Sequence, residues 1–389
     1  MISSFWVGCL VRSDHRELFL RSRDRLMDRR VAIIGAGPAG CSAALRCGRL
    51  GLPAVLFEAG GRYRDKPCGD GLVASAVTYA RSFGLSDRHF FSFGGRQFSR
   101  IDIELKGASY EVLALPHPGG WVIPRAALDQ ALRDAVSATC EVHYGSVVRH
   151  VVPTGSGISV TVSQSGRTIH ELFGAVIVAT GAASRLSQFL GIDGSPKRGL
   201  AFRGYVPRQN GRDGLLFEFA GGPILQYRWV FPMGDRINVG ACRLGGCISR
   251  SKGGGNAALR ALAGYSDGLK LVGGVEPLWS GRANRWHHAG GVVSCGDCAG
   301  LVDPLTGEGI TAAFISGDMA ASAVAEYLGC RDELALDRFS IRIAEVFSER
   351  YSADRERHLL SLFRPSAGRG RGSRGRAGVS PFISSSDLS

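Results

Sequence analysis

The sequence predicts an α/β fold in which a parallel sheet with covering helices is interleaved with a mainly antiparallel β-sheet and followed by a C-terminal helix. Three observations lead to this prediction. A glycine-rich turn joins an apolar strand to an apolar helix near residue 35, a second strand–turn–helix pattern lies at residues 290–324, and six strand-like segments lie between them. Strands that alternate with helices favour a parallel sheet, whereas strands joined by short polar turns favour an antiparallel one.

The first pattern, at residues 29–62, predicts a Rossmann-type dinucleotide site. Its turn consists of Gly35, Ala36, Gly37, Pro38, Ala39 and Gly40. Gly35 permits the tight turn, Gly37 lets the backbone approach a pyrophosphate, and Gly40 lets the following helix pack closely on the strand. The helix N-terminus offers free N–H groups to the phosphates, and Glu58, at the end of the next strand, can accept hydrogen bonds from a ribose. FAD and NAD remain equally compatible with these residues.

The second pattern favours FAD. A strand is expected to end at Gly296–Asp297, and a helix is expected to begin near Gly309 after an intervening loop. Asp297 can then bind a ribityl hydroxyl, while the N–H groups of Gly309 and Ile310 face the pyrimidine edge of a flavin and stabilise its negative charge when it is reduced. The alternative is that Asp297 caps its own helix.

The middle of the chain predicts the antiparallel sheet. Its strand candidates are "RIDIEL", "YEVLAL", "LAFRGYVP", "LLFEFA", "LQYRWVFP" and "RINVGA". Because side chains alternate along a strand, Leu225, Tyr227, Trp229 and Phe231 should share one face. That face is either part of an ordinary hydrophobic core or the wall of a substrate site.

These segments predict a discontinuous domain organisation. Residues 27–86, 120–196 and 285–330 are assigned to the FAD-binding domain, residues 87–119 and 197–284 to the substrate domain, and residues 331–363 to a C-terminal helical segment. Met27 directly precedes the first strand, so residues 1–26 are interpreted as an N-terminal extension. Residues 364–389 form an Arg/Gly/Ser-rich tail that cannot bury a core and is expected to be disordered.

The composition of the chain indicates the cellular compartment in which we expect the protein. The 389-residue chain carries a net charge of +13, with five arginines in each of the two terminal segments, and it contains ten cysteines. No secretory signal or bilayer-spanning run is recognised, so we expect a cytoplasmic protein with reduced thiols, and peripheral membrane contact is left open. Cys295 and Cys298 have the spacing of a redox pair, but small buried thiols are the favoured interpretation.

At this point the chain resembles the geranylgeranyl reductase family of FAD-dependent oxidoreductases, which have the p-hydroxybenzoate hydroxylase-like fold. The resemblance covers roughly residues 28–330. It rests on "GAGPAG" with Glu58, "KPCGDGL", "VIPRAALDQALRD", "VIVATGAAS", "YRWVFP" and "GDCAGLVDPLTGEGI". The motifs "KPCGDGL" and "YRWVFP" together are much more specific than "GAGPAG" and "GDCAGLVDPLTGEGI", which are shared across the wider flavoprotein superfamily. The chain departs from the family's usual pattern at Asp70, where a small or different polar residue is common.

The resemblance implies roles for further residues. Cys68, Gly69 and Gly71 would lie against the flavin, Arg125 would contact the FAD phosphates or ribityl chain, and Val148 would hold the adenine through its backbone. Cys68 and Tyr227 are candidate catalytic residues, although neither is assigned as the proton donor.

The implied activity is saturation of double bonds in an isoprenoid (geranylgeranyl or polyprenyl) chain by hydride transfer from reduced flavin. Tyr227, Trp229 and Phe231 would then form the apolar substrate wall. The chain has no second glycine-rich fingerprint, so NADPH would have to visit transiently, or a ferredoxin would deliver the electrons.

Two other functions stay open. An FAD-dependent monooxygenase or halogenase could use the same fold, although Thr180 stands where hydroxylases usually place an Asp and "YRWVFP" does not match the halogenase motif. A non-catalytic flavin-bound protein could instead act through its basic tail, for which binding of RNA or acidic lipid is conceivable but nucleic acid is not the expected partner. The oligomeric state is not indicated.

Overall fold

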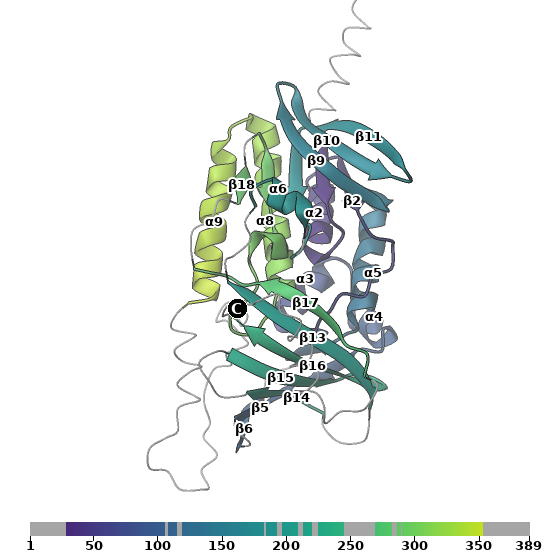
Figure 1. The fold of residues 1–389 in the computed structure, drawn as a ribbon, viewed down its shortest axis with the longest axis vertical. Helices are drawn as coiled ribbons and strands as arrows, with labels where there is room; N and C mark the ends of the chain where they lie inside the picture. Colours follow the sequence, from purple (N-terminus) through teal and green to yellow (C-terminus); the bar gives the residue numbers. More distant parts are fainter. Residues whose placement is uncertain are drawn as a thin grey trace, which may run out of the picture.

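The computed structural model describes most of the chain between residues 29 and 352. The described ranges are 29–105, 108–114, 119–182, 184–192, 197–208, 213–219, 225–244, 269–281, 286–288 and 290–352. The predicted N-terminal extension, at residues 1–26, and the predicted tail, at residues 364–389, lie outside them. In Figure 1 the helices and the β9–β11 hairpins occupy the upper part of the molecule, and a large sheet crosses the lower part.

The upper part is built on a six-stranded sheet with the order β18-β19-β12-β1-β2-β8. Its strands are β1 (Val31–Ile34), β2 (Ala54–Glu58), β8 (Glu141–Tyr144), β12 (Ala175–Val178), β18 (His287–His288) and β19 (Val292–Ser294). All neighbouring pairs are parallel except β18 with β19. All four residues of β1 are buried, which agrees with a parallel strand that is covered on both faces.

Helices cover one face of this sheet. They are α2 (Pro38–Arg49), α3 (Ala74–Ser82), α5 (Arg125–Ser137), α8 (Ile310–Cys330) and α9 (Leu334–Arg350), with the short helices α4 (Asp87–Ser92) and α6 (Arg185–Phe189) elsewhere. The other face packs on a three-stranded antiparallel sheet of β9 (Ser146–Thr154), β10 (Gly157–Gln164) and β11 (Arg167–Phe173). The result is a layer of helices, a parallel sheet and an antiparallel sheet, each burying apolar side chains against the next.

The lower part is a seven-stranded sheet with the order β17-β13-β16-β15-β14-β5-β6. Its strands are β5 (Arg100–Leu105), β6 (Ala108–Ala114), β13 (Arg198–Pro207), β14 (Leu215–Phe219), β15 (Leu225–Pro232), β16 (Arg236–Leu244) and β17 (Val272–Pro277). Only the β14–β5 pair is parallel. All six predicted strand segments therefore belong to one mainly antiparallel sheet, and the predicted fold class is confirmed. A small sheet of β3 (Gly71–Val73), β7 (Gly120–Val122) and β4 (Arg96–Phe98) lies between the two parts.

One predicted boundary is wrong. The strand expected to end at Gly296–Asp297 ends at Ser294, and residues Gly296–Ala299 form a 3₁₀ helix instead. Gly296 has φ +69°, which an extended strand cannot adopt, so the chain has left the sheet before it reaches Asp297. Cys295 and Cys298 are both buried thiols that donate hydrogen bonds to backbone carbonyls. None of the helices in the described part is long and apolar enough to cross a membrane.

Candidate active site

The glycine-rich turn, which connects β1 to α2, lies at the opening of a cleft. Gly35 has φ +109°, and a Cβ there would lie 2.4 Å from the Ala179 carbonyl oxygen. A Cβ on Gly40 would lie 1.8 Å from the Gly35 carbonyl oxygen, so this glycine lets α2 pack against the turn. A Cβ on Gly37 would meet nothing within 4 Å, which leaves its backbone open to the cleft. The N-terminus of α2 thus faces an accessible space, as binding of a pyrophosphate requires.

Glu58 organises this turn. Its carboxylate oxygens accept hydrogen bonds from the backbone N–H groups of Ala36, at 2.7 Å, and Gly60, at 2.8 Å. The side chain is buried, and the Arg133 guanidinium lies 3.6 Å away. A carboxylate has about four lone-pair sites, so Glu58 retains the capacity to accept a ribose hydroxyl.

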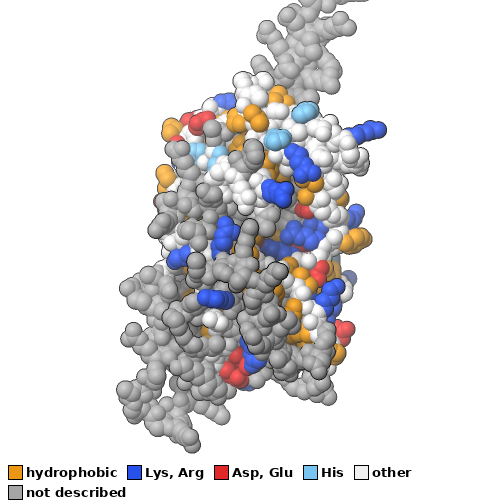
Figure 2. Space-filling view, viewed as in Figure 1, with side chains coloured by type: hydrophobic (Ala, Val, Ile, Leu, Met, Phe, Trp, Pro, Cys, Tyr) orange, Lys and Arg blue, Asp and Glu red, His pale blue; other side chains and the backbone are white. Residues whose placement is uncertain are grey.

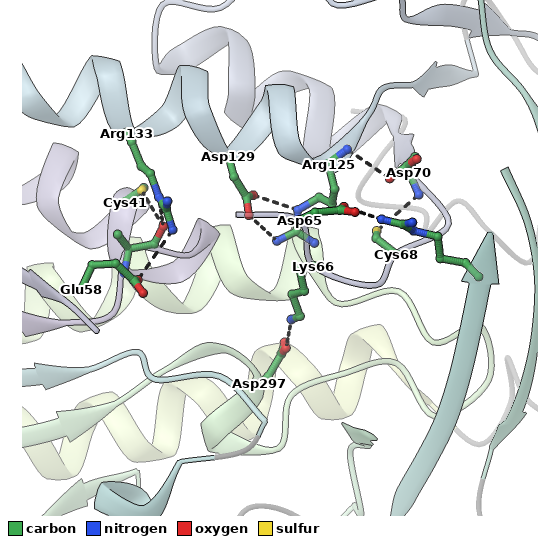
Figure 3. A network of polar contacts seen from close by, with 12 residues as sticks. Cys41, Glu58, Asp65, Lys66, Cys68, Asp70, Arg125, Asp129, Arg133 and Asp297 are labelled. Carbon is green, nitrogen blue, oxygen red and sulfur yellow. Dashed lines mark hydrogen bonds and ion pairs between the residues drawn. The ribbon is translucent and has the colours of Figure 1, made fainter. Parts of the chain in front are cut away.

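Arg133 is a residue that the sequence reasoning missed. It is 1% exposed, and its Nε donates to the Ala36 carbonyl oxygen at 3.0 Å. Figure 3 shows Arg125, Asp129 and Arg133 projecting from one side of α5 toward the cleft. Their spacing of four residues puts them on one helix face, and that regular charge pattern within "RAALDQALRD" was the signal that could have identified Arg133.

The cleft has a volume of about 580 Å³, within the usual range of ligand pockets. Twelve of the predicted cofactor-binding residues line it: Gly35, Gly37, Pro38, Ala39, Glu58, Cys68, Gly69, Arg125, Val148, Asp297, Gly309 and Ile310. Gly40 lies beneath the turn and Gly71 lines a neighbouring cavity, so these two are not part of the cleft wall.

Figure 2 shows Lys and Arg side chains gathered across the middle of one face. The cleft lining includes Arg64, Lys66, Arg149 and Arg185, a charge balance suited to an anionic ligand.

Asp297 and Lys66 form an ion pair within this cleft (Figure 3). Burial raises the pKa of Asp297, but the Lys66 ammonium, with smaller contributions from Arg125 and Arg64, holds that pKa below its ordinary value. Asp297 is therefore a carboxylate and a hydrogen-bond acceptor. The N-terminus of α8 lies next to it, since a Cβ on Gly309 would be 3.3 Å from Asp297 Oδ1.

Arg125 and Cys68 lie where the cleft meets the antiparallel sheet. Arg125 is buried, and its guanidinium donates to both carboxylate oxygens of Asp129, at 2.8 and 3.3 Å. Burial raises the pKa of the Cys68 thiol, and the nearby Arg125 only partly offsets this effect. Cys68 is therefore a neutral thiol rather than a nucleophilic thiolate.

Asp70, the unusual residue of the "KPCGDGL" loop, fixes the loop in place. Its backbone has φ +64° and its side chain is fully buried. The carboxylate accepts hydrogen bonds from the Arg125 backbone N–H at 3.1 Å, the Tyr205 hydroxyl at 2.6 Å and the Asn238 amide at 2.8 Å. Since Tyr205 and Asn238 belong to the seven-stranded sheet, Asp70 ties the cofactor cleft to that sheet.

A second cavity, of about 130 Å³, lies beside the cleft and is lined by the aromatic face of β15. The side chains of Tyr227, Trp229 and Phe231 form this face, and each is 5–6% exposed. The polar groups of the two residues that carry one are hydrogen-bonded. The Tyr227 hydroxyl donates to the Thr306 carbonyl oxygen, and Trp229 Nε1 donates to Asn238 Oδ1 at 2.8 Å. The face is thus partly hydrophobic core and partly cavity wall. The side chain of Leu225 lies outside the described residues.

The cavity and the cleft share part of their lining. Residues that line both include Cys68, Gly69, Glu276, Gly307 and Gly309. The shared residues come from the "KPCGDGL" loop, β17 and the loop before α8. A planar group bound at this border would have the cleft on one side and the aromatic cavity on the other.

Comparisons with known proteins agree with this geometry. Residues 29–210 match the pyridine nucleotide-disulphide oxidoreductase family. The chain is 30% identical over 318 residues to menaquinone reductase of Mycolicibacterium smegmatis, an alignment that covers 75% of each protein. It is also 30% identical over 327 residues to digeranylgeranylglycerophospholipid reductase of Methanothrix thermoacetophila, with 78% of this chain and 79% of the relative covered.

The protein belongs to the geranylgeranyl reductase family of FAD-dependent oxidoreductases. Its fold is similar to that of a solved geranylgeranyl bacteriochlorophyll reductase-like protein from Thermoplasma acidophilum, with a TM-score of 0.72, 20% identity, and 82% of this chain and 84% of the other covered. The predicted family, the enzyme class and the FAD cofactor are confirmed. The cleft of this geranylgeranyl reductase family member fits FAD because its lining combines an open phosphate cradle at the glycine turn with two hydrogen-bond acceptors, Glu58 and Asp297.

Proposed function

We propose that this family member reduces double bonds in the isoprenoid chain of a lipid or quinone, with electrons from FAD. The observation that supports this most directly is the aromatic cavity, which borders the cofactor cleft and shares part of its lining. Tyr227, Trp229 and Phe231 give one part of the cavity wall an apolar surface. An isoprenoid is a hydrocarbon chain that such a wall accommodates.

The chemistry requires close positioning because an isolated alkene has little charge to stabilise. FAD, once reduced, supplies a hydride to one carbon of the double bond. The protein's part is to hold that carbon at near-attack distance and to exclude water. A cavity of about 130 Å³ is comparable to a void that holds one benzene molecule, so it admits about one five-carbon unit of a longer chain. We propose that the rest of the chain lies outside this cavity.

The names of the relatives guide the choice of substrate. A menaquinone reductase and a digeranylgeranylglycerophospholipid reductase both take their names from molecules with isoprenoid chains. We therefore propose a membrane-resident prenyl lipid or prenylquinone as substrate and NADPH or a ferredoxin as electron donor. A protein that takes such a substrate would meet the membrane surface, and contact at the periphery of a cytoplasmic membrane is part of this proposal.

Mass spectrometry of lipids from cells with and without the protein tests the proposed function. We expect prenyl lipids from the cells that contain the protein to be heavier by two hydrogens for each double bond reduced. An unchanged set of isoprenoids would contradict the proposal. The experiment is repeated anaerobically with purified protein, because a monooxygenase or halogenase would need oxygen and a reductase would not.

A further inference from the structure

The reduction of an alkene needs a proton as well as a hydride, and the described part of the structure places an acid, Glu276, where it could supply that proton. Glu276 lies on β17 and lines both the aromatic cavity and the cofactor cleft. Its carboxyl group makes no hydrogen bond or ion pair with any residue in the described ranges, although it is half-buried. A half-buried carboxyl group that lines two adjoining cavities and has no partner among the described residues is available to a bound ligand.

The carboxyl group of Glu276 lies beside Gly307, near one end of the aromatic wall. A Cβ on Gly307 would lie 3.0 Å from Glu276 Oε2 and 3.4 Å from the Tyr227 hydroxyl oxygen. Gly307 has φ +70° and lines both cavities. The carboxyl group of Glu276 and the Tyr227 hydroxyl therefore both lie beside Gly307, at the border between the cavities.

The tyrosine and cysteine side chains in the cavity are weaker acids than a carboxyl group. Burial raises the pKa of Tyr227 well above its ordinary value, and the hydroxyl proton is already donated to the Thr306 carbonyl oxygen. Burial also raises the pKa of the Cys242 thiol well above its usual range and raises that of Cys68. Glu308 also lines the cavity and burial raises its pKa, but its carboxyl group already accepts a hydrogen bond from the Thr311 backbone N–H at 2.7 Å, whereas Glu276 has no such partner among the described residues.

The charged groups near Glu276 keep its carboxyl group protonated close to neutral pH. Burial is the largest effect, the Asp297 carboxylate adds to it, and the Lys66 ammonium opposes both, with a resulting pKa of about 7. The other titratable side chains that line the cavity are Cys68, Tyr227, Cys242, Asp303, Glu308 and Arg350. A general acid is most effective when its pKa lies near the working pH.

We propose that Glu276 is the general acid that delivers a proton to the substrate carbon during double-bond reduction. This rests on the proposed reduction of an isoprenoid. Two-electron-reduced flavin gives a hydride to one alkene carbon, and Glu276 gives its proton to the other. The π bond breaks, two C–H bonds form, the flavin is oxidised and Glu276 becomes a carboxylate. It regains a proton on the side of the cleft, where the Lys66 side chain is 28% exposed to solvent.

A single-turnover experiment on the FAD-loaded protein tests this role. The flavin is reduced anaerobically, the prenyl substrate identified by lipid mass spectrometry is added, and flavin reoxidation is followed by absorbance across the pH range. In the wild type the rate should fall as the pH rises above about 7, because the acid form of Glu276 is lost. Glu276→Gln should lower the rate by about 10²–10⁴-fold and remove this pH dependence, with unchanged FAD content.

Three further measurements separate a catalytic role from a structural one. Glu276→Asp should restore part of the rate with a pH dependence, because it retains a carboxyl group. Glu345→Gln removes a carboxylate on exposed α9 and should leave the rate unchanged. Infrared titration of the oxidised, substrate-free protein should show a protonated carboxyl signal that disappears near pH 7 in the wild type and is absent from Glu276→Gln.

The outcomes distinguish this inference from the proposed function. If the wild type reduces a prenyl lipid but Glu276→Gln does so at a similar rate or with the same pH profile, Glu276 is not the proton donor and the proposed function stands. If the infrared titration shows that Glu276 is ionised well below pH 7, the inference is also overturned. If the wild type reduces no isoprenoid, both proposals fail together.

Discussion

At the scale of single residues, the site depends on three acidic side chains, Glu58, Asp297 and Glu276, which differ in their protein partners. Glu58 and Asp297 are recognisable from their motifs, yet each already has protein partners: backbone N–H groups for Glu58 and Lys66 for Asp297. Glu276 belongs to no motif. It stands in "GVEPLW", and its single signal was an acid within an otherwise apolar strand-like segment.

The raised pKa of Glu276 predicts a pH-dependent stability. Its pKa rises from 4.5 to about 7 on folding, so the folded state disfavours the ionised form. This group costs no stability below about pH 4.5; the cost grows between about pH 4.5 and 7 and is fully present above about pH 7. Glu276→Gln removes the cost. We expect the variant to be more stable than the wild type at pH 8, by up to roughly 3 kcal/mol, with little gain at pH 4. Denaturant unfolding at both pH values measures the difference, and an equal effect at both would contradict it.

Trp229 tests whether the aromatic face contacts substrate. Trp229→Phe keeps most of the packing but loses the indole donor to Asn238, so we expect a stability loss of about 1–2 kcal/mol and full retention of FAD. If the face lines the substrate site, KM for the prenyl substrate should rise several-fold. Trp229→Ala should retain FAD and lose turnover under the same interpretation. Thermal unfolding and flavin absorbance provide the check, because loss of both fold and flavin would instead indicate a purely structural residue.

At the scale of elements, close contact between α2 and α8 positions two helix N-termini at the cofactor cleft. Ser42 Oγ on α2 donates to the Phe314 carbonyl oxygen of α8 at 2.7 Å. A Cβ on Gly317 of α8 would lie only 2.2 Å from the Ala39 carbonyl oxygen, so the glycine permits the approach. Both helices start at residues that line the cleft, Pro38 in α2 and Ile310 in α8.

Gly317→Ala should therefore separate these two helices. We expect a loss of about 1–3 kcal/mol in stability, because the added methyl group has no space, and weaker FAD binding because the N-termini shift. Gly329→Ala is the matched control on the same helix, since a Cβ there meets nothing within 4 Å. It should be neutral or stabilising by up to about 1 kcal/mol. Denaturant unfolding and FAD titration of both variants measure the effects, and similar losses in both would argue against the packing explanation.

At the scale of the whole molecule, the site exists where the two large sheets come together. The "KPCGDGL" loop is attached to the antiparallel sheet by Asp70 and by the Asn238 amide, which donates to the Cys68 carbonyl oxygen at 2.8 Å. Gly69 approaches the aromatic strand so closely that a Cβ would lie 3.0 Å from the Phe231 ring. Loop, strand and cleft are therefore one connected unit.

Deletion of residues 364–389 tests whether catalysis resides in this unit or in the basic tail. All the cleft and cavity residues lie between residues 34 and 350. We expect the shortened protein to retain FAD. Its turnover of substrate in detergent should lie within about two-fold of the wild-type value. Flavin content and prenyl reduction are measured side by side. A loss of activity with FAD retained would favour a function for the tail.

The sequence by itself determined the dinucleotide turn, the residues of the two strand–turn–helix patterns that line the cleft, the six strands of the antiparallel sheet and the family. These follow from local rules: glycines where the backbone turns or approaches a neighbour, and side chains that alternate along strands. Val31–Ile34 and "LQYRWVFP" both became strands where their patterns predicted them.

Only the tertiary structure decided which of these residues act together. Arg133 reaches the turn at Ala36 from a helix almost a hundred residues further along the chain, and Asp70 meets Asn238 across the domain border. Burial, which no local pattern specifies, makes Cys68 a neutral thiol and gives Glu276 a pKa of about 7. Local sequence thus established the cofactor cleft, whereas the long-range packing of two sheets created the aromatic cavity beside it and the acid at their border.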